Sequence, residues 1–305
     1  MKKTAQQPSP LDNSQIQHYR EQGYLCPIDV LDQTDAIRLR AALEGAEDLQ
    51  GHPLDRLQCN KSYLLFDWAD ELVHHPAILD AVESLIGPDI LCYMTNLFTK
   101  EAGSQSYVSM HQDAAYWGVD ADDVVTAWVA LSPATKNSGV MKIEPGSHKK
   151  ILPQVNTYAK DNLLTRGQEI ASEHLDSDRQ IYMDLQPGQM SLHHYLLVHG
   201  SDANTTSDRR IGFAIRYVAA SANKIGQPES ALLVRGKNSG NFIMEKRTRH
   251  LSHKARIREH TRALRRQMQN IFEPEENAGL KEKLRLRATK TLGTGLSYWK
   301  ELTAR

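Results

Sequence analysis

The chain has 305 residues, 40% of them hydrophobic, and its 37 basic and 37 acidic residues give a formal net charge of zero. This length and composition suit one large domain with its own core, or such a domain with an appendage. No run approaches the ~18 apolar residues of a membrane-spanning helix, so a transmembrane helix is excluded and we expect no membrane partner.

The first part of the chain is predicted to be helical apart from one strand. We expect residues 1–12 to be disordered, and they lack the apolar stretch of a secretory signal. Ser14 is predicted to cap the first helix, which Gly23 ends. Apolar residues at helical spacing predict helices over residues 14–22, 34–48 and, as two short segments, 66–86, with a strand at 24–28. These helices are expected to cover the outside of a β core.

From about residue 90 the pattern changes to strands. Apolar runs and alternation predict strands over residues 90–100, 106–113, 124–132, 140–145, 181–185, 190–200 and 209–220, the last being the final core strand. Residues 150–178 are polar and irregular, which in a compact fold is typical of a lid or a substrate loop. Helical spacing returns after residue 245. We therefore predict disordered residues 1–12, a β-rich domain over 13–245 and a helical C-terminal extension over 246–305.

His111 and Asp113 are separated by one residue in a predicted strand. Side chains two positions apart in a strand lie on the same face, so one imidazole and one carboxylate converge. His199, in a later strand, is a candidate third ligand. Two His and one carboxylate on one face of a metal leave the opposite positions open, as in non-haem Fe(II) oxygenases. The chain has 13 His, so an isolated His-x-Asp occurs by chance, and His193 and His194 compete for the third position.

The segment HGSDANTTSDRR, residues 199–210, offers a cation to the same site. Its Asp, Asn, Ser and Thr residues are turn formers, so we predict a hairpin in which His199 pairs with Arg210. Directly opposed residues share a face, about 5 Å apart. A guanidinium beside a metal with open positions is suited to bind a carboxylate in a fork. A bulge in the loop would shift this register.

The strand predicted after this loop has two different faces. One is apolar and should be packed, with Ile211, Phe213, Ile215 and Tyr217. On the other, two small residues between two arginines leave room for a ligand, in the order Arg210, Gly212, Ala214 and Arg216. Arg216 is predicted to hold an anionic group of a ligand, and an ion pair at the end of a barrel is the equal alternative.

The order of these sequence features resembles the phytanoyl-CoA dioxygenase (PhyH) family of Fe(II)- and 2-oxoglutarate-dependent oxygenases. The features are HQD at 111–113, the Trp in TAWVAL, the PGSHK turn and HGSxxNxxSxRR at 199–210, and the likeness runs from about residue 14 to about residue 245. It implies a mainly β fold with flanking helices (α+β). The core would be a double-stranded β-helix, a cupin-like jelly roll, with a helical N-terminal cover and a helical C-terminal segment.

The resemblance also implies roles for individual residues. His111, Asp113 and His199 look like the iron ligands. Arg210, eleven residues after the last of them, looks like the clamp on the far carboxylate of 2-oxoglutarate, and Ser201 resembles the hydroxyl that assists it. These two offsets favour His199 over its histidine neighbours.

Further contacts are implied or suggested around this set. Trp128 resembles the aromatic wall of the cosubstrate pocket. Asn204 matches a family Asn that holds the loop. Tyr116, just after the His-Gln-Asp motif, could wall a substrate pocket, with Arg216 as a second substrate contact.

The implied reaction uses Fe(II), 2-oxoglutarate and O2, releases succinate and CO2, and hydroxylates an unactivated carbon of a small metabolite. Asp113 favours hydroxylation over halogenation, because relatives that halogenate have a small residue there, which leaves a position for chloride. Arg216 favours an acidic or zwitterionic substrate. Two alternatives stay open: a cupin-like metal-binding protein without turnover, and an oxidative nucleic-acid demethylase. A hydrolase ranks low because the chain has no GxSxG elbow.

The C-terminal extension is basic, with 16 Lys and Arg against 6 Asp and Glu from Lys246 onward. Basic segments can indicate nucleic acid, but its aromatic residues are too dispersed for base stacking, so no nucleic-acid partner is expected. We predict an amphipathic helix packed on the acidic remainder of the chain, or on a second subunit of a homo-oligomer. Its apolar stripe would be Leu251, Ile257, Leu264, Met268, Ile271 and Phe272. Three scattered cysteines, Cys26, Cys59 and Cys92, predict reduced thiols and a cytoplasmic protein.

Overall fold

A computed structural model of the chain describes residues 10–120, 124–271, 280, 283–284 and 286–291. Of the segment expected to be disordered, residues 1–9 lie outside the described part. Residues 10–12 are ordered, contrary to the prediction, because Leu11 is buried and its backbone N–H donates to Ser84 Oγ at 3.1 Å.

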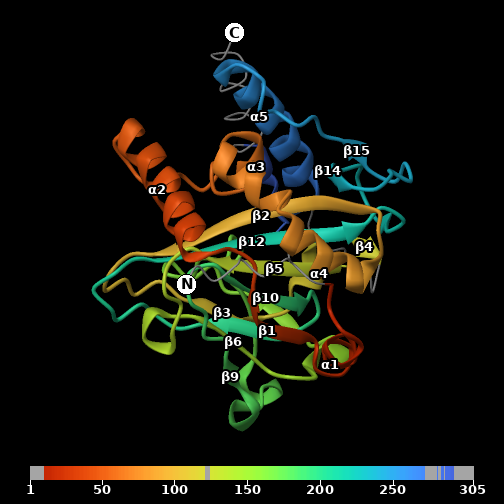
Figure 1. Ribbon diagram of the computed structural model, residues 1–305. Helices are drawn as coiled ribbons and strands as arrows, with labels where there is room; N and C mark the ends of the chain where they lie inside the picture. Colours follow the sequence, from red (N-terminus) through yellow and green to blue (C-terminus); the bar gives the residue numbers. More distant parts are fainter. Residues whose placement is uncertain (1–9, 121–123, 272–279, 281–282, 285, 292–305) are drawn as a thin grey trace.

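Two sheets of mainly antiparallel strands face each other and form the core (Figure 1). Within the described residues, the larger sheet has the order β1 (Tyr24–Asp29), β10 (Gln189–His194), β5 (Val124–Ala130), β12 (Arg210–Ala219), β2 (Ile90–Lys100), β14 (Ser230–Arg235) and β15 (Ile243–Met244). The smaller sheet has the order β3 (Val108–His111), β11 (His199–Ser201), β6 (Met141–Ile143) and β9 (Ile181–Tyr182). The predicted mainly β jelly roll with flanking helices is confirmed.

Two short strand pairs lie beside these sheets. They are β4 (Val119–Asp120) with β13 (Asn223–Lys224), and β7 (Gln154–Asn156) with β8 (Gln168–Ile170). The second pair orders the polar insertion at residues 150–178, which the sequence pattern left irregular.

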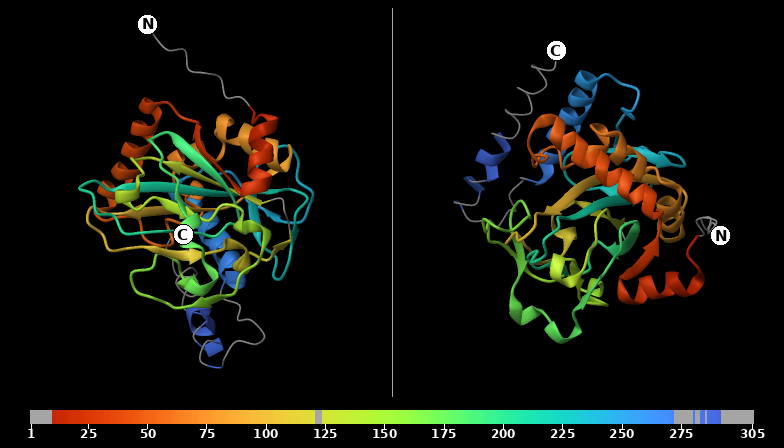
Figure 2. Two further views of the ribbon diagram at one scale, coloured as in Figure 1. Left: turned by 90° about the horizontal axis from the view of Figure 1, so that it is seen from below. Right: turned by 60° about the vertical axis from the view of Figure 1, so that its left-hand side comes forward.

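Helices cover the outer face of the larger sheet (Figures 1 and 2). The α-helices in the described residues are α1 (Asn13–Gln22), α2 (Gln33–Gln50), α3 (Asp67–Val73), α4 (Pro76–Ile86) and α5 (His253–Ile271). The 3-10 helices are η1 (Ser62–Leu64), η2 (Asp113–Tyr116), η3 (Lys136–Ser138), η4 (Ser147–Lys149), η5 (Ser172–His174) and η6 (Ser177–Arg179). The predicted N-terminal helices are thus confirmed.

The cap of α1 differs from the prediction. Asp12 caps this helix, because its carboxylate accepts from the backbone N–H of Gln15 at 2.9 Å, while Ser14 donates its hydroxyl to the same carboxylate. Gly23 ends the helix in the left-handed conformation, with φ of 82°, as predicted.

The faces of β12 are those expected from its sequence. Its apolar residues pack with α3 and α4 in the main core; Trp68 of α3, for example, meets Phe213 edge to face with ring centroids 5.2 Å apart. The prediction that this strand ends the core was wrong. β14 follows it and pairs with β2, where Leu232 lies opposite Cys92, because the long strand β2 has a second edge to be paired.

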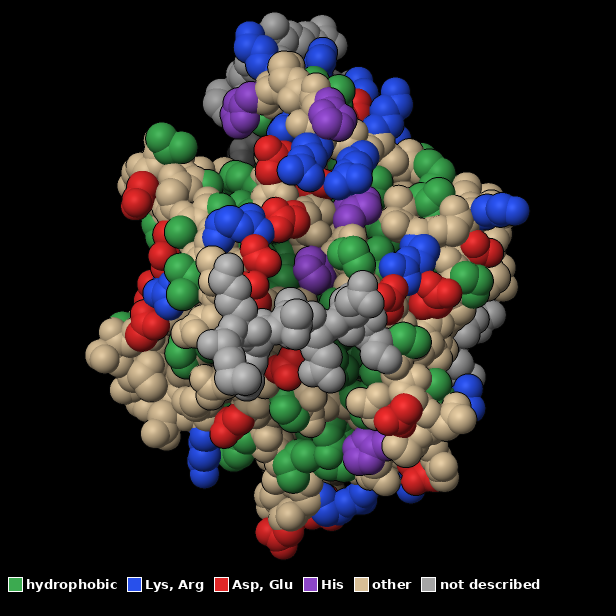
Figure 3. Space-filling view, in the orientation of Figure 1, with side chains coloured by type: hydrophobic (Ala, Val, Ile, Leu, Met, Phe, Trp, Pro, Cys, Tyr) green, Lys and Arg blue, Asp and Glu red, His purple; other side chains and the backbone are tan. Residues whose placement is uncertain are grey.

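The described part of the C-terminal extension packs on the body of the protein. Arg247 forms an ion pair with Asp70 at 2.6 Å, and Arg256 forms one with Asp67 at 2.7 Å. Other Lys, Arg and His side chains gather at this end of the molecule (Figure 3). Of the predicted apolar stripe, Leu264 and Met268 are buried. Leu251 precedes the helix and is exposed, and Phe272 lies outside the described residues. None of the described helices is long and apolar enough to cross a bilayer.

Candidate active site

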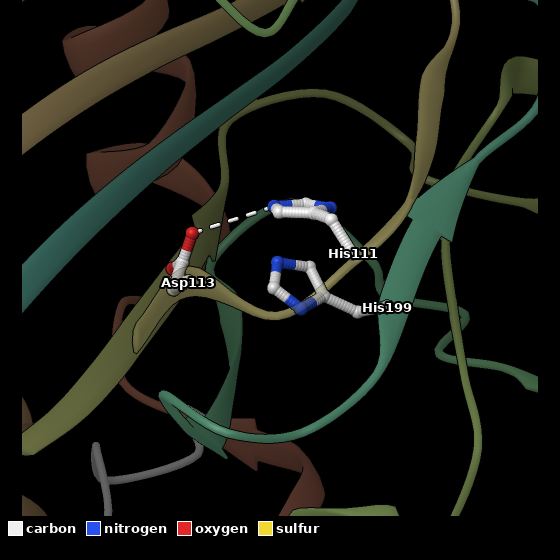
Figure 4. Close-up of side chains that lie close together, drawn as sticks. All are labelled: His111, Asp113 and His199. Atoms are coloured by element: carbon white, nitrogen blue, oxygen red, sulfur yellow. Dashed lines mark ion pairs between the residues drawn. The ribbon is translucent and has the colours of Figure 1, made fainter. Parts of the chain in front are cut away.

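The smaller sheet and the segment that follows β3 bring His111, Asp113 and His199 together (Figure 4). His111 ends β3, and His199 begins β11 directly opposite it in the antiparallel register. Asp113 lies just beyond the strand, at the start of η2, and not on it as predicted. Gln112 between them is extended, so both side chains still point to the same side. All three residues are buried, and one ligand atom from each lies within 4.8 Å of the others.

The hydrogen bonds of the two imidazoles fix which nitrogen faces the centre. His111 Nδ1 lies 2.9 Å from the carbonyl of Ser109, and His199 Nδ1 lies 2.8 Å from that of Leu197. A carbonyl oxygen can only accept, so each Nδ1 carries the proton and each Nε2 presents a lone pair. Burial, then the neighbouring His111, lowers the pKa of His199 to about 4, which keeps this imidazole neutral near pH 7.

The carboxylate of Asp113 completes a set of donors without a cation between them. Its Oδ1 lies 3.4 Å from His111 Nε2, and its buried Oδ2 has no hydrogen-bond partner among the described residues. Burial alone would raise the pKa of Asp113, but Arg216 and the imidazoles outweigh it and hold the pKa below its ordinary value. Two lone pairs and an anion facing one another repel unless a cation lies between them. The residues therefore fit a divalent metal bound by two His and one carboxylate.

Neither of the two competing histidines belongs to the donor group. His193 lies in β10 and lines a cavity, called the first cavity below, that His111, His199 and Arg210 also line. Its ring packs against His199 at a centroid distance of 4.9 Å. His194 contacts His148 and Tyr19 instead. The structure thus places His199, and neither neighbour, with the other two predicted ligands.

The predicted hairpin between His199 and Arg210 was wrong. His199 pairs with His111 and Ile143 in the smaller sheet, whereas Arg210 pairs with Lys100 in the larger sheet. Residues 202–209 cross from one sheet to the other, because the chain passes between layers instead of folding back. Arg210 still lines the same cavity as His199, from the opposite wall.

Arg210 is a buried cation with few partners. It is 2% exposed, and its one described hydrogen bond goes to the carbonyl of Phe98 at 3.4 Å. Its guanidinium lies over the ring of Trp128, 5.4 Å from the centroid. Burial lowers its pKa to about 10, so it remains charged at pH 7. A buried charge needs a counter-charge, and the first cavity, which this residue lines, is where an anion could supply it.

Gly212, two residues after Arg210 in β12, is required by the position of Trp128. A Cβ on Gly212 would lie 1.8 Å from Cζ2 of Trp128, so only glycine lets the indole of Trp128 cross this part of β12. The predicted room on this face of the strand is therefore partly filled by Trp128, which forms the wall.

Ser201 is held by a residue that the sequence pattern did not single out. Lys100, fully buried at the end of β2, donates to Ser201 Oγ at 2.7 Å and to the carbonyl of Asp202. Burial, with Arg210 nearby, lowers the pKa of Lys100 to about 6. Asn204 holds the crossing loop, because its amide donates to the carbonyls of Lys100, Glu101 and Asp208. A lone Lys at a strand end carries no sequence signal, which is why it was missed.

Arg216 lies between two cavities. Its Nη2 is 3.7 Å from Asp113 Oδ2, and its Nη1 donates to Asn96 Oδ1 at 2.5 Å. Together with Phe98, it lines both the first cavity, which contains His111, His199 and Arg210, and a second cavity of about 270 Å3, which contains Asp113. The alternative prediction for Arg216 was an ion pair at the end of the barrel. Arg216 does form an ion pair, but its partner is Asp113 of the donor set. The side chain of Tyr116 lies outside the described residues.

The insertion borders the second cavity. Residues 163–166 and Gln168 line it. Gln112 fixes the start of the insertion: its Nε2 donates to the carbonyl of Lys150 at 2.7 Å, and its Oε1 accepts from the N–H of Leu152 at 2.9 Å. The insertion therefore lines the second cavity together with Asp113, and its role as a lid or substrate loop stays a prediction.

The model of the phytanoyl-CoA dioxygenase (PhyH) family matches residues 19–212, which is more than half of the chain. The chain belongs to this family. A solved structure titled "non-heme monooxygenase; ThoJ apo" is 35% identical and has a TM-score of 0.75, covering 84% of this chain and 96% of that one. The fold and the order of the site segments are therefore those of a family of known architecture.

Two curated relatives show the range of the family. The probable alpha-ketoglutarate-dependent hypophosphite dioxygenase of Stutzerimonas stutzeri is 30% identical over 161 residues, covering 52% of this chain and 56% of the relative. The 1-deoxypentalenic acid 11-beta-hydroxylase of Streptomyces arenae is 27% identical over 264 residues, covering 75% and 89%. The chain spans about half the length of the first of these and of the phytanoyl-CoA dioxygenases that it matches. Family membership and these relatives support the predicted cofactors, Fe(II) and 2-oxoglutarate.

Proposed function

We propose that the protein is an Fe(II)- and 2-oxoglutarate-dependent dioxygenase that hydroxylates an unactivated carbon of a small acidic or zwitterionic metabolite. Succinate and CO2 would be the coproducts. The observation that supports this best is a single cavity lined by His111 and His199 of the metal set and by the buried guanidinium of Arg210, which has no counter-charge among the described residues. A diacid could bind the metal through one carboxylate and Arg210 through the other. It would then supply a ligand to the metal and a counter-charge to the guanidinium.

Each residue then has a defined task. His111, Asp113 and His199 would hold the ferrous ion, and their backbone-bonded Nδ1 atoms keep the imidazoles in the correct tautomer. Arg210 would bind the far carboxylate of 2-oxoglutarate in a fork, and Ser201, oriented by Lys100, would donate or accept beside it. When bound, the iron and cosubstrate supply the oxidising chemistry, and the protein supplies position and exclusion of water.

The carboxylate of Asp113 bears on the type of oxidation. If His111, Asp113 and His199 all hold the metal, no ligand position would be freed for a halide, as it would be with a small residue at position 113. Arg216 and the neighbouring imidazoles outweigh the effect of burial and keep this carboxylate ionised, and therefore able to bind metal. We propose hydroxylation and not halogenation. A chlorinated product from the unmodified protein in chloride-containing buffer would contradict this.

The proposal is tested by 2-oxoglutarate turnover in a matched pair of variants. Purified protein with Fe(II) and O2 should convert 2-oxoglutarate to succinate and CO2, slowly without substrate and faster with the correct one. His199→Ala should abolish the conversion, whereas His194→Ala, five positions earlier and directed away from the donor set, should retain it. Iron binding without any succinate would favour the alternative of a metal-binding protein without turnover.

The second alternative, a nucleic-acid demethylase, rested on the basic extension. Arg247 and Arg256 of this extension pair with acidic residues of α3, which favours the view that its charge serves intramolecular packing. Oligomerisation through the C-terminal helices stays a prediction that analytical ultracentrifugation would test. The free thiols Cys26, Cys59 and Cys92 fit the proposed cytoplasmic localisation.

A further inference from the structure

The second cavity is lined by segments inside the family-matched region and by residues beyond its C-terminal end. β2 contributes Met94, Asn96 and Phe98, and the insertion contributes residues 163–166 and Gln168. α5 contributes Gln267, which lies beyond the residues matched by the family model. Because Asp113 also lines this cavity, a molecule bound in it would lie beside the donor set.

The charge of the lining favours an anion. Three guanidinium groups, those of Arg56, Arg166 and Arg216, line the cavity, and the one carboxylate in the lining, that of Asp113, pairs with Arg216, so positive charge remains in excess. Arg166 and Arg216 are 3% and 6% exposed, so their charges act at low dielectric and are poorly screened. Most of the remaining wall is apolar, including Leu97, Phe98, Trp117, Leu163 and Leu164. A cavity of about 270 Å3 with this lining suits a small molecule that has one anionic end and an apolar body.

Gln267 is the unusual polar group of this wall. It is 3% exposed, and its one hydrogen bond among the described residues goes from Nε2 to the thioether of Met94 at 3.5 Å. A thioether is a weak acceptor, and buried amides normally have stronger partners. Most of the bonding capacity of this amide is therefore left for a ligand in the cavity.

We propose that the second cavity binds a small carboxylate with an apolar body, and that Gln267 of the C-terminal helix is a specificity-determining contact to a second polar group of that ligand. The guanidinium groups hold the carboxylate, and the amide of Gln267 donates to or accepts from a carbonyl, amide or hydroxyl. The C-terminal helix is thus part of the substrate site. The inference rests on the proposed oxygenase function, since it takes the bound acid to be the substrate.

The test uses a panel of N-acetylated apolar amino acids and 3-phenylpropanoate-type acids, each paired with its carboxamide. Binding is followed by tryptophan fluorescence of the metal-free protein, and by the visible absorption of the anaerobic protein with Fe(II) and 2-oxoglutarate. We expect at least one acid to bind, and its carboxamide to bind at least tenfold more weakly, because the amide lacks the charge that the guanidinium groups select.

Variants of Gln267 test the second half of the proposal. Gln267→Met keeps the shape of the side chain and should raise the Kd of the acid about fivefold, the worth of one net hydrogen bond. Gln267→Glu adds a like charge and should raise it more than tenfold. Gln269, on the same helix but in neither cavity lining, provides the matched controls Gln269→Met and Gln269→Glu, which should stay within twofold of the unmodified protein.

Three results would overturn the inference while leaving the oxygenase proposal intact: no acid binds to protein that binds 2-oxoglutarate, acids and carboxamides bind alike, or Gln267→Met binds as the unmodified protein does. Failure to bind Fe(II) or 2-oxoglutarate at all would instead overturn the proposed function itself.

Discussion

Replacing Arg210 by Met should weaken 2-oxoglutarate binding without weakening the fold. In the absence of cosubstrate, the guanidinium is 2% exposed and makes one described hydrogen bond, of 3.4 Å. Removing one partner of a buried, hydrogen-bonded charge pair costs about 2–5 kcal/mol. At 1.4 kcal/mol per factor of ten, the Kd for 2-oxoglutarate should rise roughly 30- to 4,000-fold.

The same variant should melt no lower than the unmodified protein when both lack cosubstrate. A buried charge without a counter-charge destabilises the native state, so an apolar side chain of similar size is neutral or stabilising there. Arg209→Met is the matched control. Arg209 pairs with Glu47 at 2.5 Å and with Glu101 at 2.8 Å, outside the cavity. Its loss should lower the melting temperature and leave the Kd unchanged.

The assay is an anaerobic titration of the Fe(II)-loaded proteins with 2-oxoglutarate, together with thermal melts of the metal-free proteins. The reasoning is refuted if Arg210→Met binds 2-oxoglutarate within threefold of the unmodified protein. It is equally refuted if this variant loses as much melting temperature as Arg209→Met, because Arg210 would then be a structural residue.

Three further predictions concern the cavity walls and the thiols. Gly212→Ala, whose new Cβ would lie 1.8 Å from Trp128, should cost about 1–3 kcal/mol of stability by overpacking and raise the Kd for 2-oxoglutarate; unchanged melting and binding would show that the indole is free to move. Arg216→Ala should raise the Michaelis constant of substrate or cosubstrate, and unchanged constants in a folded variant would remove its proposed role. Burial raises the pKa of Cys26 and of Cys59 to about 12, so their alkylation rate should still be rising with pH above 10; a plateau near pH 9 would contradict this.

Local pattern was enough to predict the elements that place the metal set. The spacing of His111 and Asp113 works because the intervening Gln112 is extended, even though the strand ends at His111 and Asp113 begins a 3-10 helix. The two faces of β12 could be predicted from the strict alternation of its residues. One face packs in the core, and the other lines the first cavity with Arg210, Ala214 and Arg216.

Contacts between distant segments could not be predicted in the same way. Turn-forming residues at 202–208 indicate a reversal but not whether it stays in one sheet, so the pairing of His199 with Arg210 was wrong although both reach one cavity. Lys100, which donates to Ser201, and Gln267, which lines the second cavity, reach these positions only through tertiary packing, and neither stands in a motif. Their place depends on which strand end and which helix face the fold turns inward.

The most direct test of the central claim is a crystal structure of the protein grown anaerobically with Fe(II), with diffraction recorded at the iron absorption edge. The account predicts one anomalous peak bonded to Nε2 of His111, Nε2 of His199 and a carboxylate oxygen of Asp113. A peak at any other site, or coordination by His193 in place of His199, would contradict it.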